Sequence, residues 1–375
     1  MVRSSSSRSR HRWAPARRWR PVLALTLVST AVGWGGLALA GSAAAATARP
    51  TGATRLAGVV PVVPVTPPGT PTPPTQISGP NAVDTAVAVS QTEFPTAGSA
   101  DAVVLARSDF FADALAGGPL AAAVGGPLLI TPGASLSSSL DPTVEAEIQR
   151  VLPVGDTVYV LGGDLALSPS IDTTLEALGY VVVREAGADE YATAIDIAET
   201  LANPTTVFEA TGLDFADALS AVPAAIEDHG AILLTDGSTQ AAETASYLAA
   251  HPADVRYAIG GPLAAAGADP GATAVFGSDQ YGTSAAVATR FFPGALLYGA
   301  ATGLDFPDAL AGGVFMATGG RTGPMLLVDP AATPPVPTAV AAYLGTLAPD
   351  TPGDVFGGPL AVPAAVLADL AAAVG

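Results

Sequence analysis

Asp109-Phe110-Phe111-Ala112-Asp113-Ala114-Leu115 is the first of three copies of one phrase, and the others are Asp214-Phe215-Ala216-Asp217-Ala218-Leu219 and Asp305-Phe306-Pro307-Asp308-Ala309-Leu310. The copies follow one another at intervals of about 100 residues. A period of that length is the size of a domain, so the phrase predicts three sibling domains rather than a solenoid.

Further phrases recur in the same order around each copy. An Ala-rich helical segment opens each repeat, at Ala82-Val83-Asp84-Thr85-Ala86, Glu190-Tyr191-Ala192-Thr193-Ala194 and Gln280-Tyr281-Gly282-Thr283-Ser284. An apolar strand comes after the phrase, at Pro127–Thr131, Ala231–Thr235 and Pro324–Val328. A second strand then ends in a glycine pair, at Gly162-Gly163, Gly260-Gly261 and Gly357-Gly358.

The order of elements within a repeat predicts the fold class. Another strand precedes each phrase, at Ala102–Ala106, Thr206–Ala210 and Ala295–Gly299. Short apolar strands that alternate with Ala-rich helices indicate a mostly parallel sheet covered on both faces. We therefore expect an α/β protein of three tandem Rossmann-like repeats, each a small, mostly parallel sheet with flanking helices, at residues 78–184, 185–275 and 276–375.

The third repeat differs from the first at its end. The first repeat continues into the strand Tyr180–Arg184, whereas the third stops after its last helix. Its sheet therefore lacks a closing strand, and Leu56–Val60 is a segment able to fill that edge.

The first 77 residues predict export. Seven Arg precede an apolar run from Pro21 to Ala40 and the small residues Gly41–Ala46, which is the layout of a secretory signal peptide over residues 1–46. An uncleaved membrane anchor is the alternative, since about 20 apolar residues can span a bilayer. Residues 47–77 are rich in Pro and Thr and are predicted to form an extended linker.

Charge excludes several partners of the exported chain. Residues 1–46 hold seven of the 15 basic residues and none of the 33 acidic ones, so cleavage leaves 8 basic and 33 acidic residues, a net charge of −25. Such a surface repels nucleic acid and anionic lipid. We expect a secreted, wall-associated protein that has no contact with nucleic acid, or with the membrane after signal cleavage. The sequence contains no Cys, so the fold depends on its hydrophobic core.

The strongest candidate binding residues are the second carboxylates of the three phrases, Asp113, Asp217 and Asp308. They follow strand ends, where open α/β sheets place their ligands, and could bind sugar hydroxyls or a divalent cation. The alternative is a capping box, in which both acidic residues of each phrase accept backbone N–H groups at a helix start.

Glycine and threonine form a second group of candidates. Gly162, Gly260 and Gly357 lie between a strand and a helix and form either an anion-binding nest or a tight turn. None continues as a dinucleotide fingerprint, which favours the turn. Thr85, Thr193 and Thr283 lie near helix starts and either contact a ligand or cap the helix.

Catalytic motifs are absent from the sequence. His229 and His251 have no partner in a recognisable motif, and the chain contains no P-loop, HExxH or GxSxG pattern. We therefore expect no catalytic residues, and we assign no residue as a metal ligand.

The triplicated set of G-x-D-x-Tyr-x-Thr-Ala, Phe-x-Asp-Ala-Leu, apolar strand and strand-Gly-Gly, behind a signal peptide, resembles the cell wall binding repeat 2 family. The resemblance covers nearly all of residues 78–375. It implies a Gram-positive surface module of three Rossmann-like repeats packed as a pseudo-trimer, which holds proteins noncovalently on anionic wall polymers. It also implies that Tyr191 and Tyr281 belong to the ligand site.

One departure from the family pattern changes the expected ligand. The family places an Arg before the motif Tyr, and here Ala82, Glu190 and Gln280 stand there, while Val83 replaces the Tyr itself in the first repeat. We therefore expect no resident cofactor and a partner that is a neutral wall polysaccharide or peptidoglycan, or an anionic polymer bridged by Ca²⁺ or Mg²⁺. A peptidoglycan hydrolase or modulator, identifiable by a pocket with paired carboxylates from different repeats, and a purely structural surface protein remain alternatives.

Overall fold

The computed structural model describes residues 72–202 and 204–375. The predicted signal peptide, most of the predicted linker and Leu56–Val60 lie outside the described residues. Within that described part, no helix is both long enough and apolar enough to cross a membrane.

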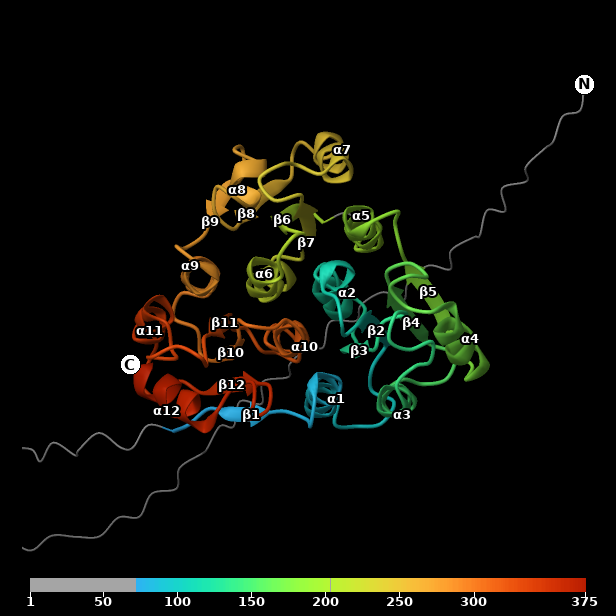
Figure 1. The fold of residues 1–375 in the computed structure, drawn as a ribbon, viewed down its shortest axis with the longest axis horizontal. Coiled ribbons are helices and arrows are strands. Elements are labelled where there is room, and N and C mark those ends of the chain that lie inside the picture. Colours follow the sequence, from blue (N-terminus) through green and yellow to red (C-terminus); the bar gives the residue numbers. More distant parts are fainter. Residues whose placement is uncertain (1–71, 203) are drawn as a thin grey trace, which may run out of the picture. The chain divides into compact units, whose positions relative to one another are not determined.

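Three parallel sheets of four strands each form the framework, and the predicted fold class is confirmed (Figure 1). The sheet of repeat 1 has the order β3-β2-β4-β5, with β2 Ala102–Arg107, β3 Leu128–Thr131, β4 Thr157–Leu161 and β5 Val181–Glu185. The sheet of repeat 2 has the order β7-β6-β8-β9, with β6 Thr206–Thr211, β7 Ala231–Thr235, β8 Val255–Ile259 and β9 Thr273–Val275. The sheet of repeat 3 has the order β11-β10-β12-β1, with β10 Tyr298–Thr302, β11 Met325–Val328, β12 Gly353–Phe356 and β1 Thr75–Ile77.

Helices connect these strands in the predicted order. Repeat 1 contains α1 Ala82–Glu93, the 3₁₀ turn η1 Ala112–Ala114, α2 Gly117–Ala123, α3 Pro142–Val151 and α4 Pro169–Ala177. Repeat 2 contains α5 Glu190–Thr200, α6 Ala216–Glu227, α7 Ala242–Ala250 and α8 Ala265–Ala268. Repeat 3 contains α9 Gln280–Phe291, α10 Pro307–Phe315, α11 Thr338–Leu344 and α12 Ala364–Ala373.

The closing strand of repeat 3 comes from the other end of the described chain. β1 pairs in parallel with β12, with Thr75 opposite Asp354 and Ile77 opposite Phe356. The Gln76 amide also donates hydrogen bonds to the carbonyls of Gly357, at 2.8 Å, and Val362, at 3.0 Å. A segment before repeat 1 therefore fills the edge, as expected, but assigning it to Leu56–Val60 was wrong. Residues 75–77 accordingly form a strand rather than the end of an extended linker.

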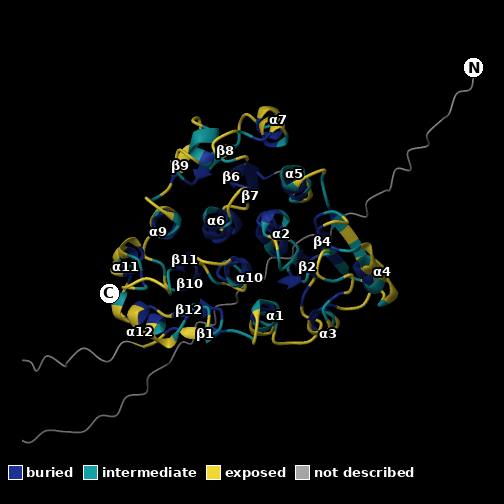
Figure 2. Cartoon of the chain, in the orientation of Figure 1, coloured by how far each residue is buried: buried dark blue, intermediate teal, exposed yellow. Residues whose placement is uncertain are grey.

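The three helices that follow the repeated phrase, α2, α6 and α10, pack against one another at the centre of the three sheets (Figure 1). Their buried faces stand out in Figure 2. At their amino ends the phenylalanines of the phrase meet pairwise: ring centroids are 5.6 Å apart for Phe111 and Phe215, 6.0 Å for Phe111 and Phe306, and 6.1 Å for Phe215 and Phe306. Such aromatic pairs contribute about 0.5–1.5 kcal/mol each beyond area burial. We call these three rings the axis cluster.

About two turns further along, the same helices come together through Gly118, Val222 and Gly313. Gly118, Val222 and Gly313 each lie five positions after the Asp of their phrase. A Cβ added at Gly118 would lie 2.5 Å from Val222 Cγ1, and one at Gly313 would lie 3.1 Å from the same atom. The side chain of Val222 thus fills the space that Gly118 and Gly313 leave open. The side-chain volumes at these three equivalent positions are therefore complementary.

Contacts between neighbouring repeats continue outward in a cyclic order. α1 packs on α10, α5 on α2 and α9 on α6, so the first helix of each repeat lies against the central helix of the preceding one. A single hydrophobic core therefore includes residues of all three repeats. Repeats 1 and 3 each have a further core on the outer face of their sheet.

The helix after the phrase is broken only in repeat 1. The phrase there forms η1, and α2 begins four residues after Asp113, whereas α6 and α10 begin before Asp217 and Asp308. Gly117-Gly118 follows Ala116 in repeat 1. Repeat 3 has the matching pair Gly312-Gly313 inside the continuous α10, so the glycines by themselves do not explain the break.

We expect Gly118→Val to lower the free energy of unfolding by about 1–3 kcal/mol, because its methyl groups would overlap Val222. Urea denaturation measures the change. Adding Val222→Gly to the same chain should restore part of the loss, since it returns the missing volume. A Gly118→Val variant as stable as the parent protein would contradict this packing.

Candidate functional site

The three candidate carboxylates lie at the junctions between repeats, each beside a candidate threonine of the next repeat. Junction 1 joins Asp113 to Thr193, junction 2 joins Asp217 to Thr283, and junction 3 joins Asp308 to Thr85; in each pair the threonine hydroxyl lies near enough to the carboxylate to lower its pKa. The structure thus brings together residues that are far apart in the sequence. Their role in ligand binding remains a prediction.

Each carboxylate is only half-buried, yet it is poorly solvated. Burial raises the pKa of Asp217 to about 6, against a smaller lowering by the Thr283 hydroxyl. Burial also raises the pKa of Asp113 and of Asp308, and the threonine of the next repeat again opposes the change. Asp308 Oδ1 is buried without a hydrogen-bond partner. These carboxylates are therefore suited to accept hydrogen bonds from an incoming ligand.

The capping interpretation holds for the first acidic residue of two phrases only. Asp214 Oδ1 accepts from the N–H groups of Phe215, at 2.6 Å, and Ala216, at 3.3 Å, and Asp305 Oδ1 accepts from the N–H of Phe306, at 2.9 Å. In repeat 1 the corresponding Asp109 instead forms a bidentate salt bridge with Arg107. The second carboxylates face threonines, so the predicted capping box does not form.

The glycine pairs are tight turns that the carboxylates approach closely. Gly162, Gly260 and Gly357 have positive φ angles of 88°, 115° and 108°. A Cβ at these positions would lie 2.6, 2.4 and 2.5 Å from Oδ2 of Asp113, Asp217 and Asp308, respectively. Glycine is therefore required both by conformation and by space. Because a carboxylate occupies the place where a nest would hold an anion, a phosphate here would be repelled.

The threonines hold the loop that enters each first helix. Thr85, Thr193 and Thr283 are buried, and their hydroxyls accept hydrogen bonds from the N–H groups of Gly79, Gly187 and Gly277 at 3.1, 3.2 and 3.2 Å. The helices themselves are capped by other residues, Asn81, Asp189 and Asp279. The predicted threonine caps are therefore loop contacts that also reach the neighbouring carboxylate.

Tyr191 and Tyr281 lie at the same ends of the strands, and each has a carboxylate of its own repeat near its hydroxyl. The carboxylate is that of Asp236 for Tyr191 and that of Asp329 for Tyr281. Burial, together with these carboxylates, raises the pKa of both phenols to about 12. Their rings cover Gly212 and Gly303, where a Cβ would approach a ring carbon to 3.1 Å and 2.6 Å.

Repeat 1 has lost all three parts of this contact. Val83, Ser108 and Pro132 stand where repeat 3 has Tyr281, Gly303 and Asp329. A serine at the glycine position would collide with a tyrosine ring, so the departure at Val83 is one of three matched changes. The tyrosine is therefore absent from repeat 1 because Ser108 leaves no room for its ring.

Junction 2 opens into a groove of about 510 Å³ between repeats 2 and 3. Asp217 and Thr283 line it together with the apolar side chains of Leu213, Leu263 and Phe276. Asp214 and Asp279 line it too, but both accept backbone N–H groups at helix starts. Of the carboxylates that line this groove, Asp217 is therefore the one that no backbone group engages.

Exposed leucines mark the same position in every repeat, which the sequence interpretation missed. Leu165, Leu263 and Leu360 are 90, 90 and 100% exposed, and each lies three residues after the first glycine of its pair. Phe110, Leu213 and Leu304 are also exposed, in the loops before the central helices. The recurrence of Gly-Gly-x-Leu was visible in the sequence and is the signal that could have identified the first set.

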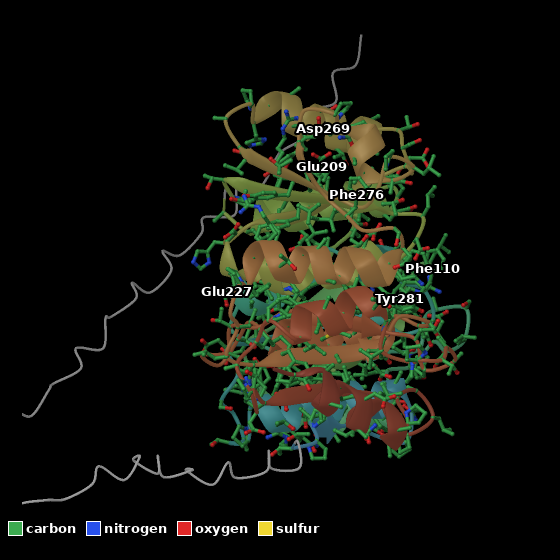
Figure 3. The ribbon with its side chains drawn as sticks, turned by 90° about the vertical axis from the view of Figure 1, so that its left-hand side faces the viewer. Phe110, Glu209, Glu227, Asp269, Phe276 and Tyr281 are labelled. Carbon is green, nitrogen blue, oxygen red and sulfur yellow. The ribbon has the colours of Figure 1, made fainter. Side chains whose placement is uncertain are left out.

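These side chains gather at the end of the molecule formed by the carboxyl ends of the strands. In Figure 3, Phe110 and Tyr281 lie on one side, whereas Glu227, at the carboxyl end of α6, lies on the other. Among residues 72–202 and 204–375, no group of three or more His, Asp or Glu side chains is placed to hold a metal ion. A bridging cation would therefore need further ligands from the bound molecule.

The comparisons with known proteins agree with this architecture. The profile of the Cell wall binding domain 2 (CWB2) family matches residues 76–172, 184–266 and 275–367, so the chain belongs to that family of wall-binding proteins. It is 26% identical over 246 residues to the N-acetylmuramoyl-L-alanine amidase LytC of Bacillus subtilis, a match that covers 64% of this chain and 48% of the relative. It is also 29% identical over 161 residues to the Amidase enhancer of the same organism, covering 43% of this chain and 21% of that protein.

Two solved structures share the fold. Cwp8 from Clostridium difficile superposes with a TM-score of 0.69 at 24% identity, over 80% of this chain and 52% of that one. Cwp6 from the same organism gives a TM-score of 0.71 at 20% identity, over 81% and 48%. The chain thus spans about half the length, or less, of the proteins it matches.

We expect Gly303→Ser to destabilise the protein, because its side chain would overlap the ring of Tyr281. The same substitution in a Tyr281→Val background should cost much less, as this pair reproduces Val83 and Ser108 of repeat 1. Thermal unfolding of the four proteins gives the coupling between the two positions, expected to be about 0.5–3 kcal/mol. Additive effects would show that Tyr281 does not lie over Gly303.

Proposed function

We propose that the three junctions each hold a segment of a wall glycan and so keep the protein noncovalently at the surface of a Gram-positive cell. The observation that carries this proposal is the combination found at junction 2, where a half-buried, poorly solvated carboxylate lies at an inter-repeat groove with exposed leucines around it. Sugar rings present hydroxyl donors and apolar C–H faces, and both match such a lining.

Charge favours a neutral glycan, or an anionic polymer whose charge is bridged by Ca²⁺ or Mg²⁺. None of the described residues that line the groove at junction 2 is basic. Of the six arginines in the described part, four form ion pairs with carboxylates and the other two, Arg290 and Arg321, lie over aromatic rings. A bare phosphate near Asp217 would be repelled, by about 1 kcal/mol per pair of charges at 4 Å in water.

The groove also bears on the hydrolase alternative. It does contain carboxylates from two repeats, Asp217 and Asp279, as that alternative requires. Asp279, however, caps α9 by accepting the N–H of Gly282 at 2.7 Å. A general acid and base both need an accessible carboxyl group, and this engagement supports a binding role instead.

Two triple variants test the proposal by retention on purified wall. Replacing Asp113, Asp217 and Asp308 by Asn should reduce retention about tenfold or more, since each amide loses one acceptor oxygen and about 1.4 kcal/mol corresponds to tenfold. Replacing Leu165, Leu263 and Leu360 by Ser should also weaken retention, with little change in stability because these side chains are exposed.

Matched controls lie at the opposite ends of the strands. Val154 and Leu296 are 73% and 80% exposed, and they precede β4 and β10. Their replacement by Ser should leave retention unchanged. A chelator that lowers retention would identify the cation-bridged form of the ligand. Retention that survives both triple substitutions would contradict the proposal.

A further inference from the structure

The outer layer of repeat 2 differs from those of repeats 1 and 3. In repeat 1, α4 contributes Ile171 and Leu175 to an apolar core on the outer face of the sheet, and in repeat 3, α12 contributes Val366 and Leu370. The corresponding helix of repeat 2, α8, is a single turn of four residues. A cavity of about 310 Å³ lies beside it, lined in part by Gln240, Arg256 and Asp269.

Polar residues replace this outer core at matching positions. Glu209 stands where repeats 1 and 3 have Leu105 and Ala300, Gln240 where they have Leu140 and Val336, and Asp269 where they have Ile171 and Val366. Arg256 likewise stands in place of Val158. Four changes at one place in one repeat, on two strands and in two loops, indicate one connected polar cluster rather than unrelated substitutions.

The cluster is incompletely hydrogen-bonded. The Gln240 amide donates to Glu209 Oε2 at 2.5 Å, and Arg256 Nη1 lies 2.7 Å from Asp269 Oδ2. Glu209 is completely buried in β6. Its Oε1 has no hydrogen-bond partner, and Asp269 Oδ2, although paired in charge with Arg256, receives no aligned hydrogen bond. Two ionised carboxylates in this arrangement would leave Glu209 Oε1 without a donor and Asp269 Oδ2 without an aligned one.

We propose that Glu209 is protonated in mildly acidic solution and donates its hydrogen to Asp269, and that this shared proton holds α8 against the sheet of repeat 2. One proton turns Glu209 from an acceptor into a donor, and it satisfies both carboxyl groups at once. It also removes the need to bury a second negative charge.

The surroundings of Glu209 support the protonated form. Its neighbours in register on β7 and β8 are Leu233 and Ala258, which carry no charge. Asp269, after α8, and Arg256, on β8, are the charged groups that face it. Burial, reinforced by Asp269 and opposed by Gln240 and Arg256, raises the pKa of Glu209 to about 7. On α7, Tyr247 and His251 stack on each other and line a separate groove toward α5.

The direction of the pH effect follows from this raised pKa. The folded protein holds the proton more tightly than the unfolded chain, in which a glutamate has its model value of 4.5. The stabilisation is therefore complete below pH 4.5 and is lost as the pH rises to about 7. Above that pH, the buried carboxylate of Glu209 and the neighbouring carboxylate of Asp269 repel each other, and α8 is expected to loosen.

Residues on both sides of α8 line the groove at junction 2. Pro262 and Leu263 precede the helix, and Phe276 and Asp279 follow it beyond β9. Loosening α8 would therefore disturb one wall of that groove. This coupling rests on the proposed function, whereas the shared proton does not.

Hydrogen exchange of the intact protein without wall tests the proton alone. Amides of residues 262–275 should open about tenfold more often at pH 8.5 than at pH 5.5, after correction for intrinsic exchange rates, corresponding to about 1.4 kcal/mol. Glu209→Gln keeps a donor toward Asp269 at every pH, so it should abolish the difference. The corresponding segment of repeat 1, residues 164–185, serves as the internal reference and should show no such change.

Asp217→Asn is the matched control, because Asp217 has a raised pKa of about 6 and lies near the same segment. This variant should keep the pH dependence. The proposal is overturned if Glu209→Gln retains the effect, if the parent protein shows none, or if CaCl2 restores protection at pH 8.5, which would indicate a cation rather than a proton. Wall retention is measured separately at the two pH values. It tests the proposed function and its coupling to α8, whereas hydrogen exchange alone tests the shared proton.

Discussion

The three phenylalanine rings of the axis cluster set the geometry on which the other features depend. Each ring comes from the phrase that also carries a junction carboxylate two residues later, so the contact that brings the three repeats together also places the three carboxylates. Because consecutive positions of a helix point about 100° apart, the phenylalanine can face the axis while the aspartate faces the neighbouring repeat. The five residues Phe-x-Asp-Ala-Leu of each phrase therefore provide both the contact between the repeats and the carboxylate of the candidate site.

The junctions show how three similar repeats support three different environments. Junction 1 has Arg107 nearby, which partly offsets the burial of Asp113, whereas Asp217 and Asp308 have further carboxylates as their charged neighbours. The matched Val83, Ser108 and Pro132 change the packing of repeat 1 without affecting the threonine or the glycine turn. Variation is therefore tolerated around the carboxylate, threonine and glycine, while these three are present at every junction.

Much of the fold could be predicted from periodicity and repetition. The parallel sheets and the order of elements follow from local pattern, because apolar strands and Ala-rich helices differ in period and length. One strand was displaced, since β10 is Tyr298–Thr302 and not Ala295–Gly299. The candidate residues Asp113, Thr193 and Gly162 were also identifiable from recurrence. What recurrence could not show was that the threonine beside each carboxylate belongs to the next repeat, since this pairing depends on how the repeats pack. The edge strand was misplaced for a similar reason: Thr75–Ile77 has only three residues, and its pairing with β12 is a contact across nearly the whole described chain.

That pairing also fixes the number of repeats. In an open array, a further unit can be added at either end, and end units need special capping surfaces. Here the strand that begins the described chain completes the sheet of the last repeat, so the array has no free end at which a fourth copy could dock without displacing β1. The three described repeats form a closed ring in which the sheet of the third is completed by a segment that precedes the first in the chain. That sheet can reach full order only after the whole ring has been translated.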